Sequence, residues 1–522
     1  MPHVVTQACC GDASCVYACP VNCIHPTPDE PDFGIAEMLY IDPATCVDCG
    51  ACVTACPVGA ITASHRLTDG QERFIDINAS MYPITSADAP DTAAGLTEAR
   101  FPVDPARRRP LAPIGHPDTL GVDGPVSVGI VGSGPSAMYA ADDLLRYPQV
   151  RVVMYERLDR PFGLARFGVA PDHESTRSVM ALFDDIAGHP RLEIRLGTEI
   201  GQDLSLEDLR SRHTAVIWAG GAPTDRRLEI DGAGSRGVTS ATSFVGWYND
   251  HPDFADLDVD LSVPEAVVIG TGNVALDVAR ILVRDPRELA ATSIAGHALA
   301  TLRNSAIGRV TILGRRGAEH AAFTLPELVG LVDGGIPVTV DQSDEVPDPS
   351  STTDPVTRAK LEVLREVAAR PTPTVPHIRF AFGRTPRTIS VVDGRACGVV
   401  VDRSDGGSEC VEAGLILTSI GYRGRPVPGL PFDPVRGVIP NENGRVVGDG
   451  TAGEPLSRSP LADVYVTGWI KRGPSGFIGT NKTDSAQTVA TLVDDLRTRA
   501  GRAGELAAPR RGSRIASLLG RL

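Results

Sequence analysis

The sequence of 522 residues contains no uninterrupted apolar run near the roughly 20 residues that a membrane-spanning helix needs, which excludes a membrane-embedded protein. Its first residues form neither a basic nor an apolar segment, so nothing predicts export and a cytoplasmic protein is expected. Acidic residues outnumber basic ones, 65 to 50, and the net charge of −15 argues against nucleic acid as a partner.

Cysteine is scarce in most of the chain, because only Cys397 and Cys410 follow position 56. Disulfide reductases need two cysteines close together in sequence, so these two are expected to be ordinary thiols. The other nine of the eleven cysteines lie within the first 56 residues. Such crowding predicts a metal cofactor, because structural disulfides are rare in a long chain that carries no export signal.

The spacing of these cysteines indicates which cofactor they hold. Residues 46–57 read CxxCxxCxxxCP, the run that binds iron-sulfur clusters in bacterial ferredoxins, whereas zinc sites usually separate their cysteine pairs more widely. The cysteine before proline points to a neighbouring cluster, so two clusters share ligands crosswise. A [4Fe-4S] cluster is therefore expected on Cys19, Cys46, Cys49 and Cys52.

The N-terminal motif is less complete, because no CxxCxxC run precedes Cys19. Three thiolates favour a [3Fe-4S] cluster there, with [4Fe-4S] as the alternative. The expected ligands are Cys9, Cys15 and Cys56; Cys10 is an alternative to Cys9, and Cys23 is expected to be a spare thiol beside a cluster.

Residues 1–80 resemble the seven-iron bacterial ferredoxins, which carry CxxxCP followed by CxxCxxCxxxCP. The first ligand departs from that pattern, because the family places it farther upstream of Cys15 than Cys9 stands. The resemblance implies an α+β ferredoxin-like domain. A proline-rich linker is expected to follow at 81–124, and a basic tail is expected at 491–522.

A glycine-rich turn follows the apolar strand expected at 126–131. Gly132, Gly134 and Ala137 form GxGxxA between that strand and a helix, the context in which this motif binds a dinucleotide pyrophosphate. The next expected strand, 150–155, ends at Glu156, whose carboxylate can accept the ribose hydroxyls. The pattern predicts a first dinucleotide-binding fold.

A second copy of the pattern begins at the expected strand 266–269. Its glycine turn includes Thr271, Gly272, Asn273 and Val274. The following strand, expected at 309–313, ends near Arg315 and Arg316 instead of an acid, and paired guanidinium groups favour the 2′-phosphate of NADP. The sequence therefore predicts an α/β protein with two Rossmann-like domains and two dinucleotides.

Residues 125–490 resemble adrenodoxin reductase and related FAD-containing ferredoxin–NADP reductases. The motifs that carry the resemblance lie at 161–173, 323–328 and 468–480. The resemblance implies a discontinuous FAD domain, 125–225 and 412–490, with an NADPH domain at 226–411 inserted into it. The whole order of domains is similar to FprB-type fusions of a ferredoxin with a ferredoxin–NADP reductase.

The resemblance also implies roles for single residues. Expected FAD contacts are Gly132, Ala137, Glu156, Leu164, Trp469, Gly476 and Ile478, and expected NADPH contacts are Gly272, Asn273, Val274, Arg315, Arg316, Glu327 and Gly476. Gly134, Thr271 and Phe477 complete the expected cofactor sites. His173 and Glu327 are candidates for catalytic proton exchange, with a structural hydrogen-bonding role as the alternative.

The predicted function is transfer of electrons from NADPH through FAD to the iron-sulfur clusters. An external one-electron acceptor protein, such as a ferredoxin or a cytochrome P450, is expected to take them further. Two alternatives remain open. One is an electron-input subunit of a larger synthase or dehydrogenase, and the other is a scaffold or redox-sensing module without enzymatic activity.

Overall fold

The computed structural model describes residues 2–82, 119–122, 124–448 and 460–507, without the side chains of 460, 462 and 501–507. Most of the linker expected at 81–124 lies outside these ranges, as does the end of the expected tail at 508–522. The described residues form a small cysteine-rich module (2–82) and two α/β domains. The order of an α+β module followed by α/β domains confirms the predicted fold class.

The cysteine-rich module consists of short strands and helices around the cysteines. Strand β1 (His3–Val5) pairs antiparallel with β4 (Ile61–Ala63), and β2 (Ile24–His25) pairs antiparallel with β3 (Tyr40–Ile41). Helices α1 (Ser14–Ala18) and α2 (Ala51–Ala55) each end directly before a Cys-Pro pair. The remaining elements are α3 (Arg73–Ser80), η1 (Pro31–Gly34) and η2 (Ser64–Arg66).

The first α/β domain contains a seven-stranded sheet of order β20-β21-β22-β8-β5-β6-β7. Strands from β22 to β7 run parallel, while β20 and β21 form an antiparallel edge. The strands are β5 (Val126–Val131), β6 (Val150–Tyr155), β7 (Leu192–Arg195), β8 (Ala215–Trp218), β20 (Asn441–Glu442), β21 (Arg445–Val447) and β22 (Pro460–Val466). The helices are α4 (Pro135–Leu145), α5 (Leu164–Phe167), α6 (Glu174–Arg177), α7 (Val179–Ala187), α8 (Leu206–Arg212), α15 (Trp469–Arg472) and α16 (Thr480–Ala507).

The second α/β domain contains a parallel six-stranded sheet of order β10-β18-β11-β12-β14-β13. Its strands are β10 (Val238–Ser240), β11 (Glu265–Ile269), β12 (Arg309–Leu313), β13 (Val338–Val340), β14 (His377–Ala381) and β18 (Leu415–Thr418). The domain also contains a separate antiparallel sheet of three strands, β15 (Arg384–Val392), β16 (Arg395–Arg403) and β17 (Ser408–Glu412). The helices are α9 (Ala241–Tyr248), α10 (Asn273–Val283), α11 (Pro286–Leu289), α12 (Gly296–Leu302), α13 (Leu325–Asp333) and α14 (Pro355–Ala368), with η3 (Pro252–Phe254), η4 (Ala318–His320) and η5 (Pro349–Ser351).

Two boundaries expected from the sequence are wrong. Residue 412 is too early for the return to the first α/β domain, because β18 still pairs with β10 and β11 in the six-stranded sheet. The two crossing segments meet later, where β9 (Thr224–Asp225) pairs with β19 (Tyr422–Arg423). Residue 490 is also too early as the start of a tail, because α16 continues to Ala507 and buries Leu492, Val493 and Leu496.

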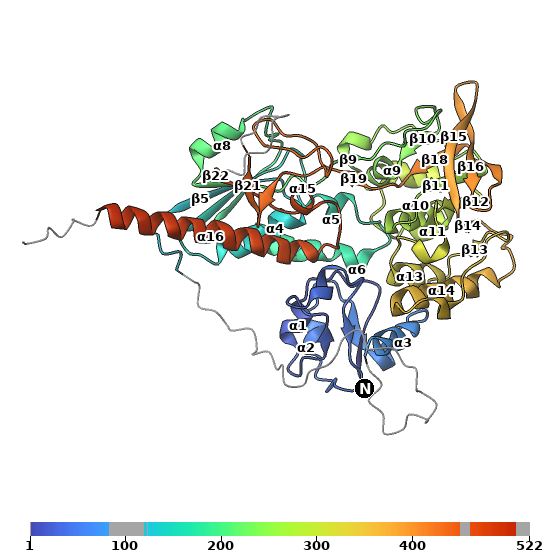
Figure 1. Cartoon of the computed structure of the whole chain (residues 1–522), viewed down its shortest axis with the longest axis horizontal. Coiled ribbons are helices and arrows are strands. Elements are labelled where there is room, and N and C mark those ends of the chain that lie inside the picture. Colours follow the sequence, from blue (N-terminus) through green and yellow to red (C-terminus); the bar gives the residue numbers. More distant parts are fainter. Residues whose placement is uncertain (1, 83–118, 123, 449–459, 508–522) are drawn as a thin grey trace, which may run out of the picture.

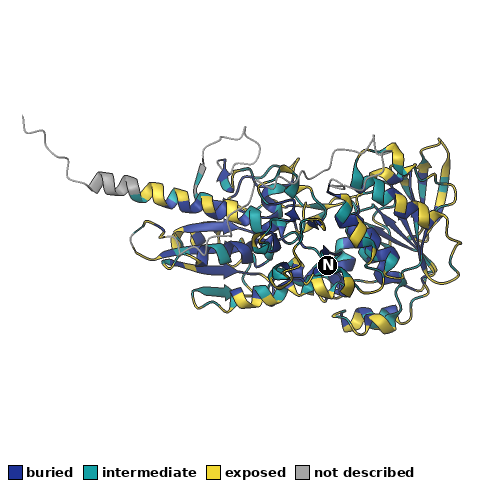
Figure 2. Ribbon diagram, turned by 90° about the horizontal axis from the view of Figure 1, so that it is seen from below, coloured by how far each residue is buried: buried dark blue, intermediate teal, exposed yellow. Residues whose placement is uncertain are grey.

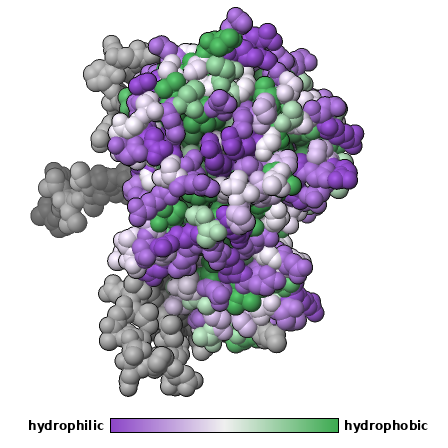
Figure 3. All heavy atoms as spheres, turned by 90° about the vertical axis from the view of Figure 1, so that its right-hand side faces the viewer, coloured by the Kyte–Doolittle hydropathy of each residue, from purple (hydrophilic) through white to green (hydrophobic). Residues whose placement is uncertain are grey.

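Both sheets are covered on their faces, which explains their apolar strands. Val128 and Ile130 on β5 and Val267 and Val268 on β11 are fully buried, as parallel strands packed under helices require. Figure 2 shows the strands of both domains in the colour of buried residues, with exposed residues on the outer helices and loops. On the face drawn in Figure 3, hydrophilic residues predominate. No helix in the described ranges has the length and apolarity of a membrane span.

The cysteine-rich module is docked against both α/β domains (Figure 1). On the first domain, the Gly479 N–H donates to the Cys10 carbonyl (2.8 Å) and Lys482 pairs with Asp12. On the second domain, Arg73 pairs with Asp333 and Glu366, while Glu37 pairs with Lys360 and accepts from the Leu325 N–H. The module therefore touches both halves of the remaining structure.

A buried ion pair joins the two α/β domains to each other. Asp172, which follows α5, accepts hydrogen bonds from Arg280 on α10 (2.7 and 2.9 Å) and from Arg284 (2.9 Å). The side chains of Asp172 and Arg280 are only 2% and 5% exposed. Although burial alone would raise it, Arg280 lowers the pKa of Asp172 below its ordinary range. The carboxylate is therefore held ionised inside the domain junction.

We expect the substitution Asp172→Ala to lower the free energy of unfolding by on the order of 3 kcal/mol, because it leaves the Arg280 charge buried with less compensation. The matched control is Asp258→Ala, since Asp258 pairs with Arg236 at 3.7 Å where both side chains are largely exposed. Its loss should stay below about 0.5 kcal/mol. Urea titrations of the two variants make the comparison, and equal losses would contradict the role assigned to Asp172.

Candidate functional site

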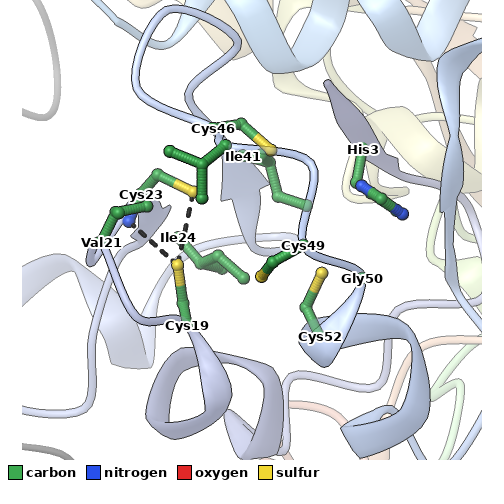
Figure 4. A pocket seen from close by; sticks show the side chains of 11 residues that line it. His3, Cys19, Val21, Cys23, Ile24, Ile41, Cys46, Cys49, Gly50 and Cys52 are labelled. Carbon is green, nitrogen blue, oxygen red and sulfur yellow. Dashed lines mark hydrogen bonds between the residues drawn. The ribbon is translucent and has the colours of Figure 1, made fainter. Parts of the chain in front are cut away.

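Five cysteines surround one cavity in the cysteine-rich module (Figure 4). Cys19 comes from the end of α1, while Cys46, Cys49 and Cys52 come from the loop before α2 and from α2 itself. These are the four residues that the sequence assigns to one [4Fe-4S] cluster, and the fold brings them together. Cys23 also lines the cavity, with its sulfur 3.4 Å from that of Cys19. The thiolate-rich lining fits an iron-sulfur cluster.

The remaining cysteines form a second group. Burial is the main cause that raises the pKa of Cys9 to about 11, with a smaller contribution from the nearby charge of Cys56. Burial also raises the pKa of Cys15, and the charges of Cys9 and Cys56 contribute to the increase. Buried thiols of this kind become thiolates only beside a positive charge, so the group also fits an iron-sulfur cluster. Cys10 instead packs into the apolar core of the first α/β domain.

The first glycine-rich turn connects β5 to α4. Gly132 has φ +97°, and a Cβ there would lie 2.7 Å from the Ala219 carbonyl, so only glycine fits. Gly134 has open space where a Cβ would point, at the N-terminus of α4, and Ala137 in the first turn of that helix is fully buried. This is the arrangement that lets backbone N–H groups approach a pyrophosphate.

Glu156 follows β6 and is buried beside this turn. Its carboxylate accepts hydrogen bonds from the Ser133 N–H (3.0 Å), the Ser133 hydroxyl (2.6 Å) and the Leu158 N–H (3.0 Å). These three donors fix the carboxylate next to the glycine turn. An acid held in this way is suited to accept ribose hydroxyls.

The second glycine-rich turn repeats the first between β11 and α10. Gly270 has φ +123°, and a Cβ there would lie 2.1 Å from the Ser419 carbonyl, just as Gly132 meets Ala219. Gly272 has open space for a Cβ, as Gly134 has. Asn273 and Val274 begin α10, and the Asn273 side chain exchanges hydrogen bonds with Thr324. Thr271 accepts from the Ala322 N–H, which links the turn to the motif at 323–328.

Arg315 and Arg316 lie where the sequence predicts the phosphate contact. They follow β12, the strand adjacent to β11, and both are exposed. Within the part of the chain that the structure describes, neither guanidinium has an ion-pair partner. Two unpaired guanidinium groups beside the glycine turn are suited to bind a phosphate bidentately.

The C-terminal motif brings its residues to the same face as the first glycine turn. A Cβ on Gly468 would lie 2.3 Å from the Ser136 hydroxyl at the start of α4. Trp469 opens α15, and Gly476 (φ +80°), Phe477 and Ile478 lead into α16. Leu164, which begins α5, is 40% exposed although it is apolar. The exposure of Leu164 fits a surface that a flat ring system covers.

His173 and Glu327 meet at the junction of the two α/β domains. The His173 Nε2 atom lies 3.8 Å from Glu327 Oε2 and 3.9 Å from Asp277 Oδ1. These are ion-pair distances, too long for direct hydrogen bonds. Asp277 accepts from Arg280 (2.8 Å), and Gln7 of the cysteine-rich module donates to Glu327 Oε2 (3.1 Å). The three groups lie within 4.8 Å of one another.

The environment of Glu327 favours its protonated form. Burial raises the pKa of this carboxyl, the charge of Asp277 adds to the increase, and His173, Arg280 and the Gln7 hydrogen bond oppose it. A carboxyl with a raised pKa is suited to proton exchange, and the 3.8 Å separation requires a bridging group or a small movement before a proton passes between Glu327 and His173. Sequence reasoning found His173 and Glu327 but missed Asp277 and Gln7, since nothing in the spacing of these residues links them.

Comparison with known protein families agrees with this geometry. Residues 8–60 and 38–86 match models of a 4Fe-4S dicluster domain, and residues 130–191 match a model of an NAD(P)-binding Rossmann-like domain. The solved structure of Mycobacterium tuberculosis FprA in complex with NADPH is similar to this chain, with a TM-score of 0.66 and 42% sequence identity. The match covers 73% of this chain and 86% of that one.

Relatives of known name match between 71% and 95% of the chain. The NADPH-ferredoxin reductase FprA of Mycobacterium tuberculosis is 43% identical over 396 residues, which are 71% of this chain and 84% of the relative. Probable ferredoxin/ferredoxin–NADP reductases of Mycobacterium bovis and Mycobacterium leprae are 52% and 50% identical, over 95% of this chain and 84% and 86% of the relatives. The chain therefore belongs to the family of ferredoxin/ferredoxin–NADP reductases.

Proposed function

We propose that the first α/β domain binds FAD, the second binds NADPH, and the cysteine-rich module carries electrons from this reductase to an external protein. The FAD domain is then discontinuous, with the NADPH domain inserted into it. The observation that carries the proposal is the contact between the Cys10–Asp12 loop and Gly479, because that loop belongs to a cysteine cluster and Gly479 lies within the C-terminal motif. When bound, the flavin supplies two-electron exchange with NADPH and one-electron exchange with clusters.

In the first domain, one group of residues binds the pyrophosphate and ribose of FAD, and another group contacts its ring system. The turn at Gly132, Gly134 and Ala137 receives the pyrophosphate at the N-terminus of α4, and Glu156 holds the ribose. The exposed apolar surface at Leu164 lies against the ring system. Further contacts to FAD are assigned to Trp469, Gly476, Phe477 and Ile478.

The residues of the second domain select NADPH. The turn from Thr271 to Val274 receives the pyrophosphate, while Arg315 and Arg316 bind the 2′-phosphate. Glu327 and Gly476 lie toward the domain junction and orient the nicotinamide. His173 Nε2 and Glu327 Oε2 are placed to hold or move the proton that accompanies hydride chemistry.

The two cysteine groups face different surroundings. The group with Cys9 and Cys15 adjoins the loop that contacts Gly479, so it faces the reductase. The group with Cys49 lies at an exposed loop, where Val47 is 58% exposed. Oxidation of one NADPH releases NADP⁺, a proton and two electrons, and each electron reduces one molecule of an external acceptor.

The external acceptor is a protein that takes single electrons, such as a ferredoxin or a cytochrome P450. Residues 1–80 carry ten acidic and two basic fixed charges, so a basic docking surface on the acceptor is complementary to the exposed loop. The reading as a subunit of a larger synthase or dehydrogenase is less well supported, because the match to fused reductases spans 95% of the chain.

The substitution Gly272→Ala should weaken NADPH binding without disturbing the fold. The backbone there has φ −85°, and a Cβ would meet no atom within 4 Å, so the methyl group projects into the space assigned to the pyrophosphate. We expect the KM for NADPH to rise about tenfold, or about 1.4 kcal/mol, with unchanged FAD content. Gly296→Ala, at another open position of the same domain, is the control. An unchanged KM would contradict the assignment.

The substitution Gly479→Ala should separate the reductase from the cysteine-rich module. An added methyl group would lie 2.2 Å from the Asp12 backbone nitrogen and 2.4 Å from its Cα, so the module must move away. We expect NADPH to bleach the flavin as before, while reduction of the clusters slows about tenfold or more in anaerobic stopped-flow absorbance. Gly34→Ala, at an open position of the same module, should change neither rate. Normal cluster reduction in Gly479→Ala would argue against this electron entry point.

The raised pKa of Glu327 predicts how the stability of the protein changes with pH. A carboxyl whose pKa is raised in the folded state contributes stability below its unfolded pKa, about 4.3, and loses it as the pH rises through the folded pKa. Glu327→Gln lacks this loss, so the thermal midpoint of the variant should gain on that of the wild type as the pH rises from about 4 toward neutrality. Glu345→Gln, which removes an exposed charge, should show no such trend. Parallel profiles for Glu327→Gln and wild type would contradict a raised pKa for Glu327 in the folded protein.

A further inference from the structure

The two cysteine motifs are copies of one backbone unit. Helices α1 (Ser14–Ala18) and α2 (Ala51–Ala55) have equal length, and both their first and their last residues are 37 positions apart. The residues before them, Ala13 and Gly50, share a left-handed conformation with φ 60° and 72°. The residues after them, Cys19 and Cys56, are both extended with ψ 116°. A shift of 37 residues therefore superimposes the first cysteine motif on the second, including the residues that flank each helix.

Hydrogen bonds to sulfur follow the same repeat. The Cys23 N–H donates to Cys19 Sγ (3.4 Å), and 37 residues later the Ala60 N–H donates to Cys56 Sγ (3.3 Å). In this register the cysteines correspond as Cys9 with Cys46, Cys15 with Cys52 and Cys19 with Cys56. The partner of Cys49 is Asp12, and the partner of Cys10 is Val47.

Asp12 is a buried carboxylate among the thiols of the first cysteine group. Its side chain is only 5% exposed. Asp12 directly precedes the left-handed residue Ala13 before α1, just as Cys49 directly precedes the left-handed residue Gly50 before α2. Lys482 Nζ lies 3.2 Å from Asp12 Oδ2, and Ser14 donates to the carboxylate through its N–H and hydroxyl. Within the described residues, Lys482 is the ion-pair partner of this carboxylate.

We propose that Asp12 takes the ligand position that Cys49 fills in the second motif. Resting on the proposed function, this assignment makes the first site a [4Fe-4S] cluster held by Cys9, Cys15, Cys56 and the Asp12 carboxylate. Cys10 is then not a ligand, because its counterpart in the repeat is Val47. Lys482 of the reductase binds the same carboxylate, so this ligand is fixed by the contact between module and reductase.

A carboxylate ligand has a chemical consequence. Oxygen ligands are harder than thiolates and hold cluster iron less firmly, so the iron on Asp12 is the first to leave. With ferricyanide as oxidant, a [4Fe-4S]²⁺ cluster releases one Fe²⁺ and passes one electron to ferricyanide, leaving [3Fe-4S]⁺ on the three cysteines. The same site thus accounts for both cluster types that the sequence leaves open.

The test compares EPR spectra and iron content of full-length protein purified without oxygen. Wild type should give a [3Fe-4S]⁺ signal only after ferricyanide, and added Fe²⁺ with reductant should remove it. Asp12→Cys should resist ferricyanide and show no such signal, whereas Asp12→Ala should show it from the start. Asp69→Cys adds a thiol at an exposed position of the same module and should behave as wild type.

A second substitution separates ligation from the ion pair. Lys482→Met removes the partner of Asp12 but keeps the carboxylate, so its first cluster should still be [4Fe-4S] before oxidation. Identical spectra for wild type, Asp12→Cys and Asp12→Ala would overturn the proposal, as would a wild-type [3Fe-4S] cluster that takes up no Fe²⁺. Bleaching of the flavin by NADPH is recorded on wild type, and its absence would contradict the proposed function instead.

Discussion

Close contact between the Cys10–Asp12 loop and Gly479 is the constraint on which the proposed electron transfer depends. The Gly479 N–H donates to the Cys10 carbonyl, and the two backbones approach so closely that no side chain fits at position 479. A one-electron carrier works only if it is held near its donor, and here backbone atoms rather than flexible side chains set the separation. The surrounding charged contacts keep this one contact in place.

The docked surface does more than the linker to position the cysteine-rich module relative to the reductase domains. A flexible linker raises the effective concentration of a tethered module to roughly the millimolar range, but it does not orient the module. Orientation comes from ion pairs at opposite sides, with Lys482 on the first α/β domain and Arg73 facing Asp333 on the second. Because the module is attached to both domains, it also restricts their movement about the junction held by Asp172 and Arg280.

The sequence predicts the parts of this structure that depend on local pattern. Cysteine spacing and the two glycine turns each predict a site within about thirty residues, and the fold brings Cys19, Cys46, Cys49 and Cys52 together around one cavity. Partners distant in sequence were not predictable, as the link between Gln7 and Glu327 shows. The apolar pattern of 415–418 also gave no sign of which sheet it joins, because a buried parallel strand has the same composition in either sheet. The correspondence of Asp12 with Cys49 becomes visible only when α1 and α2 are aligned.

The contact between Gln7 and Glu327 adds a role for the cysteine-rich module beyond carrying electrons. Gln7 reaches from that module into the junction where His173, Asp277 and Glu327 meet, and a Cβ on Gly330 would strike its side chain. The module therefore covers one side of these three groups. Excluding water strengthens the electrostatic interactions inside such a site and limits side reactions of reduced cofactors. Under the proposed function, docking therefore supports the hydride step as well as the electron step, since one contact surface serves both.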